Sequence, residues 1–325
     1  MRRLVSSVLF LTAIISSAQT GDSFRERIRN SDSFEKIFIL ANTINLEKPK
    51  GAEIQSIRKA IPIDNDEIVF LIAGKGIYKI LLYNEKGEFK GNIGEAGYDP
   101  EDYFSPSSLL KDGEDNIYIF DPPKQRANIF TPDNEFKGSI PLSPVGPFAY
   151  MNSRKEIFIP TWSPEKKSSD FIYKFTPQGK KISEFGESNK REDRSFMPEA
   201  DILICIDRND FIYAISSELM TIRKFNSDGK LITEFGGRNA RMMTLTDKNG
   251  KLGARQRYAE NAFIYRDVLF ICYDDSQCDA YDIEGELIKK DIRIKKRIIS
   301  SSERGIYALS EGDESNAVYK FIFSE

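Results

Sequence analysis

Hydrophobic and polar residues alternate in short runs along most of the chain, the pattern expected of β-strands with one buried face. The runs begin near Ile37 and are separated by turns rich in Asp, Asn, Gly and Pro. Residues 171–186 show the unit clearly, because Gly179 separates two alternating segments. Similar segments occur at residues 80–94, 221–236 and 280–288. The pattern predicts an all-β protein built from a repeated unit.

One short signature marks each unit: Ile or Leu, followed by Val, Tyr or Phe, opens a strand after a polar turn. It occurs at Ile68-Val69, Ile117-Tyr118, Ile157-Phe158, Ile212-Tyr213, Leu269-Phe270 and Ile306-Tyr307. An aromatic residue follows near the end of the next strand, at Tyr83, Phe130, Phe175, Phe225, Tyr281 and Phe321. Successive signatures are 49, 40, 55, 57 and 37 residues apart. This spacing is typical of propeller blades separated by loops of variable length.

Each unit contains four predicted strands. In the fourth unit they cover residues 201–206, 211–216, 221–225 and 231–235. A β-sandwich of ordinary hairpins is the alternative. Six copies in phase favour a six-bladed β-propeller of four-stranded antiparallel blades, which leaves only short sheet edges.

The two ends of the chain predict how the ring closes. The last unit stops after its third strand, at residues 318–323, and an unassigned strand runs from Lys36 to about Asn45. We expect this N-terminal strand to become the fourth strand of the last blade.

The N-terminal residues have the features of a secretory signal peptide. Arg2 and Arg3 precede an apolar stretch over residues 4–18, which ends in the small residues Ser16, Ser17 and Ala18. A membrane anchor is the alternative, but a spanning helix needs about 20 apolar residues. We therefore expect a signal peptide over residues 1–18, a flexible polar lead-in over 19–35 and a propeller over 36–325. The mature protein would be periplasmic or secreted.

Composition excludes several classes of function. The chain has 47 basic and 50 acidic residues, a balance that argues against nucleic acid as a partner. It has no histidine, which excludes a Ser-His-Asp triad, a Cys-His pair and a His-ligated zinc site. We expect a monomer with no membrane span after signal cleavage.

Two segments resemble NHL repeats. One runs from Ser105-Pro106 through residues 115–121 and 126–130 to Phe136, and the other covers residues 197–236. From residue 36 to 325 the chain resembles exported bacterial six-bladed propellers of the NHL-repeat or TolB-like type. The resemblance implies a fold and says little about activity. Amidating lyases, paraoxonase-like lactonases and streptogramin lyases of this kind use histidines that the chain lacks. Gluconolactonase-like relatives bind a divalent metal through carboxylate and Asn side chains, but no residue-by-residue match to their site is found.

Long connections predict a ligand-binding face, since binding residues concentrate in loops on a rigid scaffold. The longest cover residues 160–170, 186–200 and 236–261. They carry an aromatic ring and several guanidinium groups, at Trp162, Arg194, Arg238, Arg241, Arg255 and Arg257. Arg pairs with carboxylate or phosphate and stacks on flat groups. The alternatives are a solvated insertion for the basic segment and a packed lid for Trp162.

Four carboxylates fall near the starts of predicted innermost strands, around the mouth of the axial channel. They are Glu53, Glu199, Asp201 and Glu260. Converging carboxylates suit calcium, but a chain with 50 acidic residues produces such groupings by chance. No cofactor is expected, and calcium is the alternative.

The three cysteines have different contexts. Cys272 and Cys278 flank a predicted hairpin turn over residues 273–277. A cross-strand disulfide and two buried thiols both remain open. Cys205 lies in an apolar strand and is expected to be a small core residue.

These features favour an exported scaffold that binds a protein, peptide or glycan through its loop face without catalysis. The alternative is a calcium-dependent hydrolase or lactonase of the gluconolactonase-like type that uses the axial carboxylates.

Overall fold

The computed structural model describes most of the chain after the N-terminal segment. The described residues are 23–49, 54, 56–74, 77–143, 146–163, 168–186, 202–216, 220–236, 242–246, 252–256, 258–273, 276–310 and 316–324. The predicted signal peptide lies outside them.

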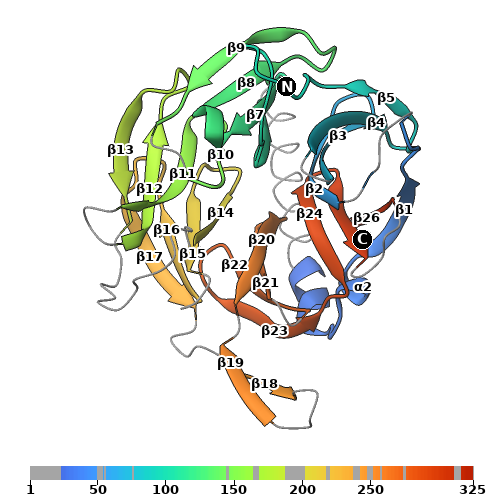
Figure 1. The fold of residues 1–325 in the computed structure, drawn as a ribbon. Helices are drawn as coiled ribbons and strands as arrows, with labels where there is room; N and C mark the ends of the chain where they lie inside the picture. Colours follow the sequence, from blue (N-terminus) through green and yellow to red (C-terminus); the bar gives the residue numbers. More distant parts are fainter. Residues whose placement is uncertain are drawn as a thin grey trace, which may run out of the picture.

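Six antiparallel four-stranded sheets form a ring, as predicted (Figure 1). Blade 1 contains β2 (Ser56–Ile63), β3 (Glu67–Gly74), β4 (Ile77–Asn84) and β5 (Phe89–Asn92). Blade 2 contains β6 (Ser108–Lys111), β7 (Ile117–Asp121), β8 (Arg126–Phe130) and β9 (Phe136–Pro141), with a 3-10 turn, η1 (Pro122–Lys124), after β7. Blade 3 contains β10 (Tyr150–Met151), β11 (Ile157–Ser163), β12 (Ser168–Phe175) and β13 (Lys181–Phe185).

The remaining blades follow in chain order. Blade 4 contains β14 (Ile202–Ile206), β15 (Ile212–Ser216), β16 (Thr221–Phe225) and β17 (Leu231–Gly236). Blade 5 contains β20 (Ala259–Tyr265), β21 (Val268–Tyr273), β22 (Gln277–Asp282) and β23 (Leu287–Arg293). Blade 6 contains β24 (Lys296–Ser302), β25 (Gly305–Ser310), β26 (Ala317–Ile322) and β1 (Ile39–Asn45). Each predicted signature lies in the second strand of its blade.

The N-terminal strand closes the ring, as predicted. β1 pairs antiparallel with β26, with Ile44 opposite Val318, and both side chains are fully buried. The strand begins later than expected, because Lys36 and Ile37 belong to a short helix, α2 (Phe34–Ile37). Closure therefore joins the first strand of the chain to the last.

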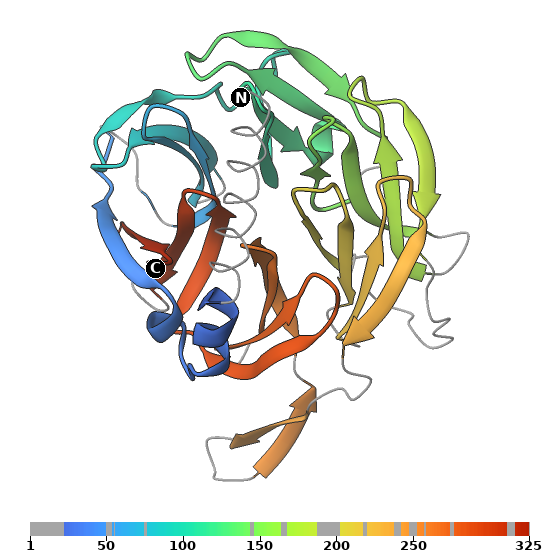
Figure 2. The same ribbon diagram turned by 180° about the vertical axis from the view of Figure 1, so that it is seen from behind.

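The expectation of a flexible lead-in is wrong for residues 23–35. Residues 23–29 form a helix beside blades 5 and 6 (Figure 2). Phe24 and Ile28 are four residues apart, so they share one helix face, and both are fully buried. The ring of Phe24 lies 4.8 Å from that of Phe323 and 5.7 Å from that of Tyr265. Two apolar side chains on one face are enough to dock this polar segment.

Asp side chains shape the turn before the signature in blades 2 and 4. Asp112 Oδ1 accepts hydrogen bonds from the backbone N–H groups of Glu114 and Asn116, and its Oδ2 accepts one from the hydroxyl of Tyr118. Asp207 in blade 4 accepts the equivalent bond from Tyr213 at 3.0 Å. Such Asx turns satisfy backbone donors locally.

Buried lysines join neighbouring blades. Lys174 in blade 3 donates to the carbonyl of Ser227 in blade 4 at 2.7 Å. Lys224 in blade 4 donates to the carbonyl of Ile283 in blade 5 at 2.9 Å. Both lysines directly precede the repeated aromatic residue of the third strand. The repeat therefore encodes contacts between blades as well as strands within them.

The long connection between blades 4 and 5 contains an unpredicted hairpin. β18 (Met242–Thr246) pairs antiparallel with β19 (Leu252–Gln256) in a separate two-stranded sheet. Figure 1 shows this hairpin beyond the rim of the ring.

Candidate ligand-binding channel

The innermost strands define the axis of the propeller. In an antiparallel four-stranded blade, the fourth strand ends at the level where the first begins, so all six innermost strands start at one face. Neighbours around the ring touch in the order β2, β6, β10, β14, β20 and β24, and β24 returns to β2. The connections between blades and those between second and third strands lie at this face, which we call the loop face. The tight turns before each signature lie at the opposite face.

An axial cavity of about 1180 Å³ lies inside this ring, and residues of all six innermost strands line it. Residues at the outer ends of second and third strands also reach it, including Tyr273, Ser276, Ser310 and Asn316. Since these residues belong to the loop face, the cavity extends to that end of the channel. Its size is that of a site for a small ligand.

The cavity wall is basic although the protein is acidic. In the described part of the chain, five cationic residues line the cavity: Arg58, Lys59, Lys111, Lys296 and Arg297. Glu260 is the one acidic residue among those lining residues, whereas the whole chain has a formal charge of -3. The charge of the cavity is thus opposite to that of the molecule.

Four of these cations lie on the innermost strands of blades 1 and 6, and two of them, Arg58 and Arg297, interact electrostatically where the blades meet. Arg58 and Lys59 lie near the start of β2, and Lys296 and Arg297 begin β24. Lys111 is different, because it ends β6 near the opposite face and pairs with Asp115. The four residues Arg58, Lys59, Lys296 and Arg297 are called the cationic cluster below.

Arg297 is held in place within the cluster. Its Nη2 donates a 2.6 Å hydrogen bond to the backbone carbonyl of Ile57 in the neighbouring blade. Desolvation lowers the pKa of Arg297, the charge of Arg58 lowers it further, and Glu260 opposes both effects. Two guanidinium groups therefore repel each other at the channel wall.

Lys59 and Lys296 differ in their partners. Lys296 Nζ donates to Ser310 Oγ at 2.7 Å and lies 3.9 Å from the ring centre of Tyr319. The side chains of Arg58 and Lys59 form no hydrogen bond or ion pair with another residue in the described ranges. The side chain of Lys59 is exposed, but the space it faces is the interior of the channel. Desolvation by the surrounding protein lowers the pKa of Lys59 there. Arg58 and Lys59 are thus the cations available to a ligand.

Cys205 lies in the same cavity wall, in β14. Burial raises the pKa of its thiol to about 12, and the charge of Lys59 opposes that change. The thiol is therefore neutral at ordinary pH, which is consistent with its predicted role as a small apolar residue. Its side chain is 7% exposed.

Hydroxyl groups and aromatic rings form much of the remaining wall. The serines are Ser56, Ser105, Ser107, Ser108, Ser276, Ser300, Ser301, Ser302 and Ser310. The aromatic residues are Tyr78, Phe148, Tyr150, Phe263 and Tyr273. The Oγ atom of Ser107 is buried and has no hydrogen-bond partner among the described residues. Phe148 remains 44% exposed.

The predicted ligand-binding residues lie mostly outside the described ranges. Arg194, Arg238, Arg241 and Arg257 fall there. Arg255 belongs to β19, and Trp162 belongs to β11 rather than to a loop, because β11 continues to Ser163. The expectation of a loop at Trp162 is therefore wrong, and the shared face of the six residues stays a prediction.

Of the predicted carboxylates, Glu53, Glu199 and Asp201 also lie outside the described ranges. Glu260 lines the cavity near the start of β20, as expected. Among the described residues no group of three or more His, Cys, Asp or Glu side chains could hold a metal ion. The charge of Glu260 acts on the guanidinium of Arg297, whose pKa it raises.

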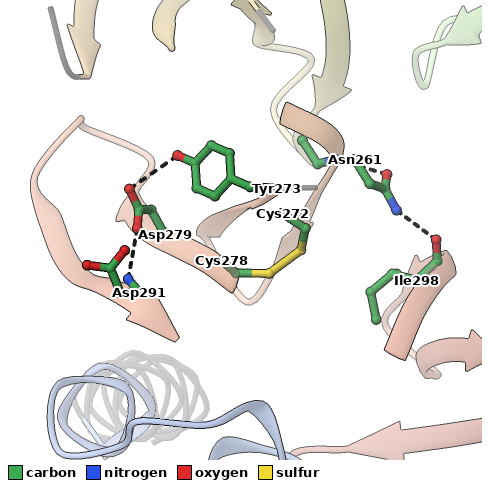
Figure 3. The surroundings of a disulfide bond; sticks show 8 residues. Asn261, Cys272, Tyr273, Cys278, Asp279, Asp291 and Ile298 are labelled. Atoms are coloured by element: carbon green, nitrogen blue, oxygen red, sulfur yellow. Dashed lines mark hydrogen bonds between the residues drawn. A yellow bond between two sulfur atoms is a disulfide. The ribbon is translucent and has the colours of Figure 1, made fainter. Parts of the chain in front are cut away.

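Cys272 and Cys278 form a disulfide across β21 and β22, which answers the question left open by the sequence (Figure 3). The two residues are directly opposite in the strand register, with Cα atoms 4.1 Å apart. Tyr273 donates to Asp279 beside the bridge, and Asp279 also accepts the backbone N–H of Asp291. Because Cys272 and Tyr273 line the cavity, the bridge fixes part of its wall.

The cationic cluster was missed by the reasoning from sequence. The signal was present in Arg58-Lys59 and in Lys295-Lys296-Arg297, which stand at the starts of two innermost strands. Neither run is unusual by itself, because 47 basic residues are spread along the chain. Only closure of the ring places the first and last blades together.

The fold and channel define the chain as a six-bladed β-propeller. Residues 21–282 match the family DUF5128, described as a 6-bladed beta-propeller, and the chain belongs to that family. None of the curated protein sequences matches the chain.

Solved structures show the same fold at low sequence identity. A protein from Bacteroides fragilis described as exported is similar with a TM-score of 0.65 and 13% identity, covering 90% of this chain and 97% of that one. A member of the duf4221 family from Bacteroides vulgatus has a TM-score of 0.55 and 11% identity, with 89% and 98% covered. Virginiamycin B lyase from Staphylococcus aureus has a TM-score of 0.50 and 11% identity, with 88% and 100% covered.

Within the described residues, no helix is both long enough and apolar enough to cross a membrane.

Proposed function

We propose that this protein is an exported, non-catalytic propeller that binds a protein segment, peptide or glycan entering from the loop face. The observation that carries the proposal is the cavity of about 1180 Å³ that all six innermost strands line. A rigid ring with a polar and aromatic interior is suited to holding a ligand. The leader-like start of the sequence supports export, as does the similarity to a Bacteroides fragilis protein described as exported.

The chemistry of the wall favours binding over catalysis. The chain has no histidine, and the thiol of Cys205 has a raised pKa. Serine hydroxyls dominate the polar wall, and a serine nucleophile needs a neighbouring base. Glu260 is the one carboxylate among the described wall residues, and its charge interacts with that of Arg297.

A channel-filling variant tests the proposal. Ser300 lies in β24 and lines the cavity, so Ser300→Trp would occupy part of it. Ile232→Trp is the matched control, because Ile232 is 49% exposed on the outermost strand of blade 4. Thermal melts would be run against a panel of short peptides and oligosaccharides, and each ligand would be recovered and checked for cleavage.

We expect at least one panel member to raise the melting temperature of the wild type and the Ile232→Trp variant, and to be recovered intact. The same ligand should leave the melting temperature of Ser300→Trp unchanged. If the ligand raises the melting temperature of Ser300→Trp as much as that of the wild type, the channel is not its binding site. Recovery of a cleaved ligand would replace the binding role with a catalytic one.

A further inference from the structure

We propose that the cationic cluster is an anion site and that the ligand of the channel is an acidic oligosaccharide bearing uronic-acid carboxylates. This inference rests on the proposed ligand-binding role of the channel and names its ligand class. The strongest observation is the contrast in charge: five described cations and one described acid line a cavity in a chain of net charge -3. A narrow site lined by one sign of charge concentrates ligands of the opposite sign.

The charged groups of the cluster have the chemistry of a carboxylate receptor, and two of them, Arg58 and Arg297, interact electrostatically. Arg297 is fixed by its 2.6 Å bond to the carbonyl of Ile57, so the ligand does not have to order it. Arg58 and Lys59 lie on the adjoining strand, and their side chains form no hydrogen bond or ion pair within the described ranges. Guanidinium groups bind carboxylates through paired hydrogen bonds, and an ammonium group adds charge.

The positive charges of the cluster cost free energy when no anion is present. Arg58 lowers the pKa of Arg297, which means that the two guanidinium groups destabilise each other's charge. Desolvation also lowers the pKa of Lys59. A bound carboxylate would relieve both effects, because an opposite charge nearby favours the charged form of each cation.

The rest of the wall points to a carbohydrate. Nine serines line the cavity, and the buried Oγ atom of Ser107 has no partner among the described residues. Serine hydroxyls can both donate and accept hydrogen bonds, as sugar hydroxyls do. A serine and a sugar hydroxyl can therefore bond with either one as the donor. Phe148 and Tyr78 supply aromatic surface for the apolar face of a sugar ring. A glutamate-rich peptide shares the charge but needs fewer hydroxyl partners.

The test variant removes the two positive charges that are available to a ligand. Arg58→Gln/Lys59→Met changes side chains that make no hydrogen bond or ion pair with other described residues, so the fold should persist. The matched control is Lys180→Met/Lys230→Met, which removes the same charge from exposed turns at the opposite face. Circular dichroism and melting temperature would confirm that both double variants fold.

Binding would be measured by calorimetry with a galacturonic-acid trimer, the corresponding neutral galactose trimer, inorganic phosphate and a glutamate-rich hexapeptide. We expect the acidic trimer to bind the wild type and the control alike, and to bind Arg58→Gln/Lys59→Met at least tenfold more weakly. The neutral trimer and phosphate should bind more weakly than the acidic trimer.

Several outcomes would overturn the inference. If Arg58→Gln/Lys59→Met binds the acidic trimer as tightly as wild type does, the cationic cluster is not the binding site of the trimer. If the neutral trimer or phosphate binds more tightly than the acidic trimer, uronic-acid carboxylates are not what the site recognises. If the peptide binds more tightly than the acidic trimer, the ligand is not a carbohydrate. A different ligand could bind the wild type but not Ser300→Trp, while the acidic trimer binds neither protein. In that case the channel is a binding site, and the proposal of an anion site is wrong. If ligands bind Ser300→Trp normally, the proposed function itself fails.

Discussion

The guanidinium of Arg297 donates a 2.6 Å hydrogen bond to the backbone carbonyl of Ile57, across the seam between the last blade and the first. These residues are 240 positions apart in the chain. The pairing of β1 with β26 completes the last blade, and the chain continues from β1 into the first blade. The candidate ligand site is therefore completed only when the ring closes, and ring closure and binding depend on shared residues.

Closure by β1 should depend on its buried side chain. Ile44 is fully buried opposite Val318, whereas its neighbour Thr43 is exposed. We expect Ile44→Asp to lower the free energy of unfolding by more than about 3 kcal/mol, because it buries an unpaired charge. Thr43→Asp should change it by less than about 1 kcal/mol. Urea denaturation measures both, and similar midpoints for the two variants would contradict closure through β1.

The contact between blades 4 and 5 should depend on Lys224. Its ammonium donates to the carbonyl of Ile283 at 2.9 Å and to Glu284 at 3.0 Å. Lys224→Met keeps much of the apolar stem and should destabilise the fold by about 1 to 3 kcal/mol, since the carbonyl of Ile283 loses a charged donor. Lys230→Met, at an exposed position of the same blade, serves as the control. A variant as stable as the control would show that Lys224 does not join the blades.

The disulfide makes a prediction about thiol content and stability. The chain has three cysteines, and Cys272 and Cys278 are bonded, so unfolded and unreduced protein should show one free thiol, that of Cys205. The bridge closes a short loop, with a sequence separation of 6. Reduction should therefore cost only about 2 kcal/mol of stability. Titration of three thiols without reductant would contradict the bridge.

Acid should weaken the Asx turn of blade 2. Burial raises the pKa of Asp112, but hydrogen bonds from Asn116, Lys155 and the backbone together outweigh it and lower the pKa to about 2. A carboxylate with a depressed pKa stabilises the fold fully above its ordinary pKa of 3.8, and that contribution is lost as the pH falls towards 2. The melting temperature of Asp112→Asn should lie well below that of wild type at neutral pH. The gap should narrow as the pH is lowered through this range, and a constant gap would show that ionisation of Asp112 does not stabilise the turn.

Local patterns in the sequence predict the blades well, because each blade is built from neighbouring segments. The turn at Asp112 and the aromatic residue at Phe225 recur for reasons that act within one or two blades. The channel depends instead on side chains brought together by the whole ring. Arg58 and Arg297 become neighbours only when the first and last blades meet, so no local pattern predicts their shared site.

The docking of Phe24 was missed for a related reason. The helix of residues 23–29 is polar overall, and its two buried side chains are too few to give a periodic pattern. Their partners, including Tyr265 and Phe323, lie more than 200 residues away in the chain.

The salt dependence of acidic-trimer binding tests the central claim most directly. Affinity would be measured from about 50 mM to about 500 mM salt, a range over which screening of exposed charges increases strongly. For wild type and the Lys180→Met/Lys230→Met control we expect affinity to fall steeply with salt. For Arg58→Gln/Lys59→Met we expect weaker binding and a shallower fall, because two of the charges that attract the ligand are absent. Identical salt dependence in all three proteins would contradict an anion site in the axial channel.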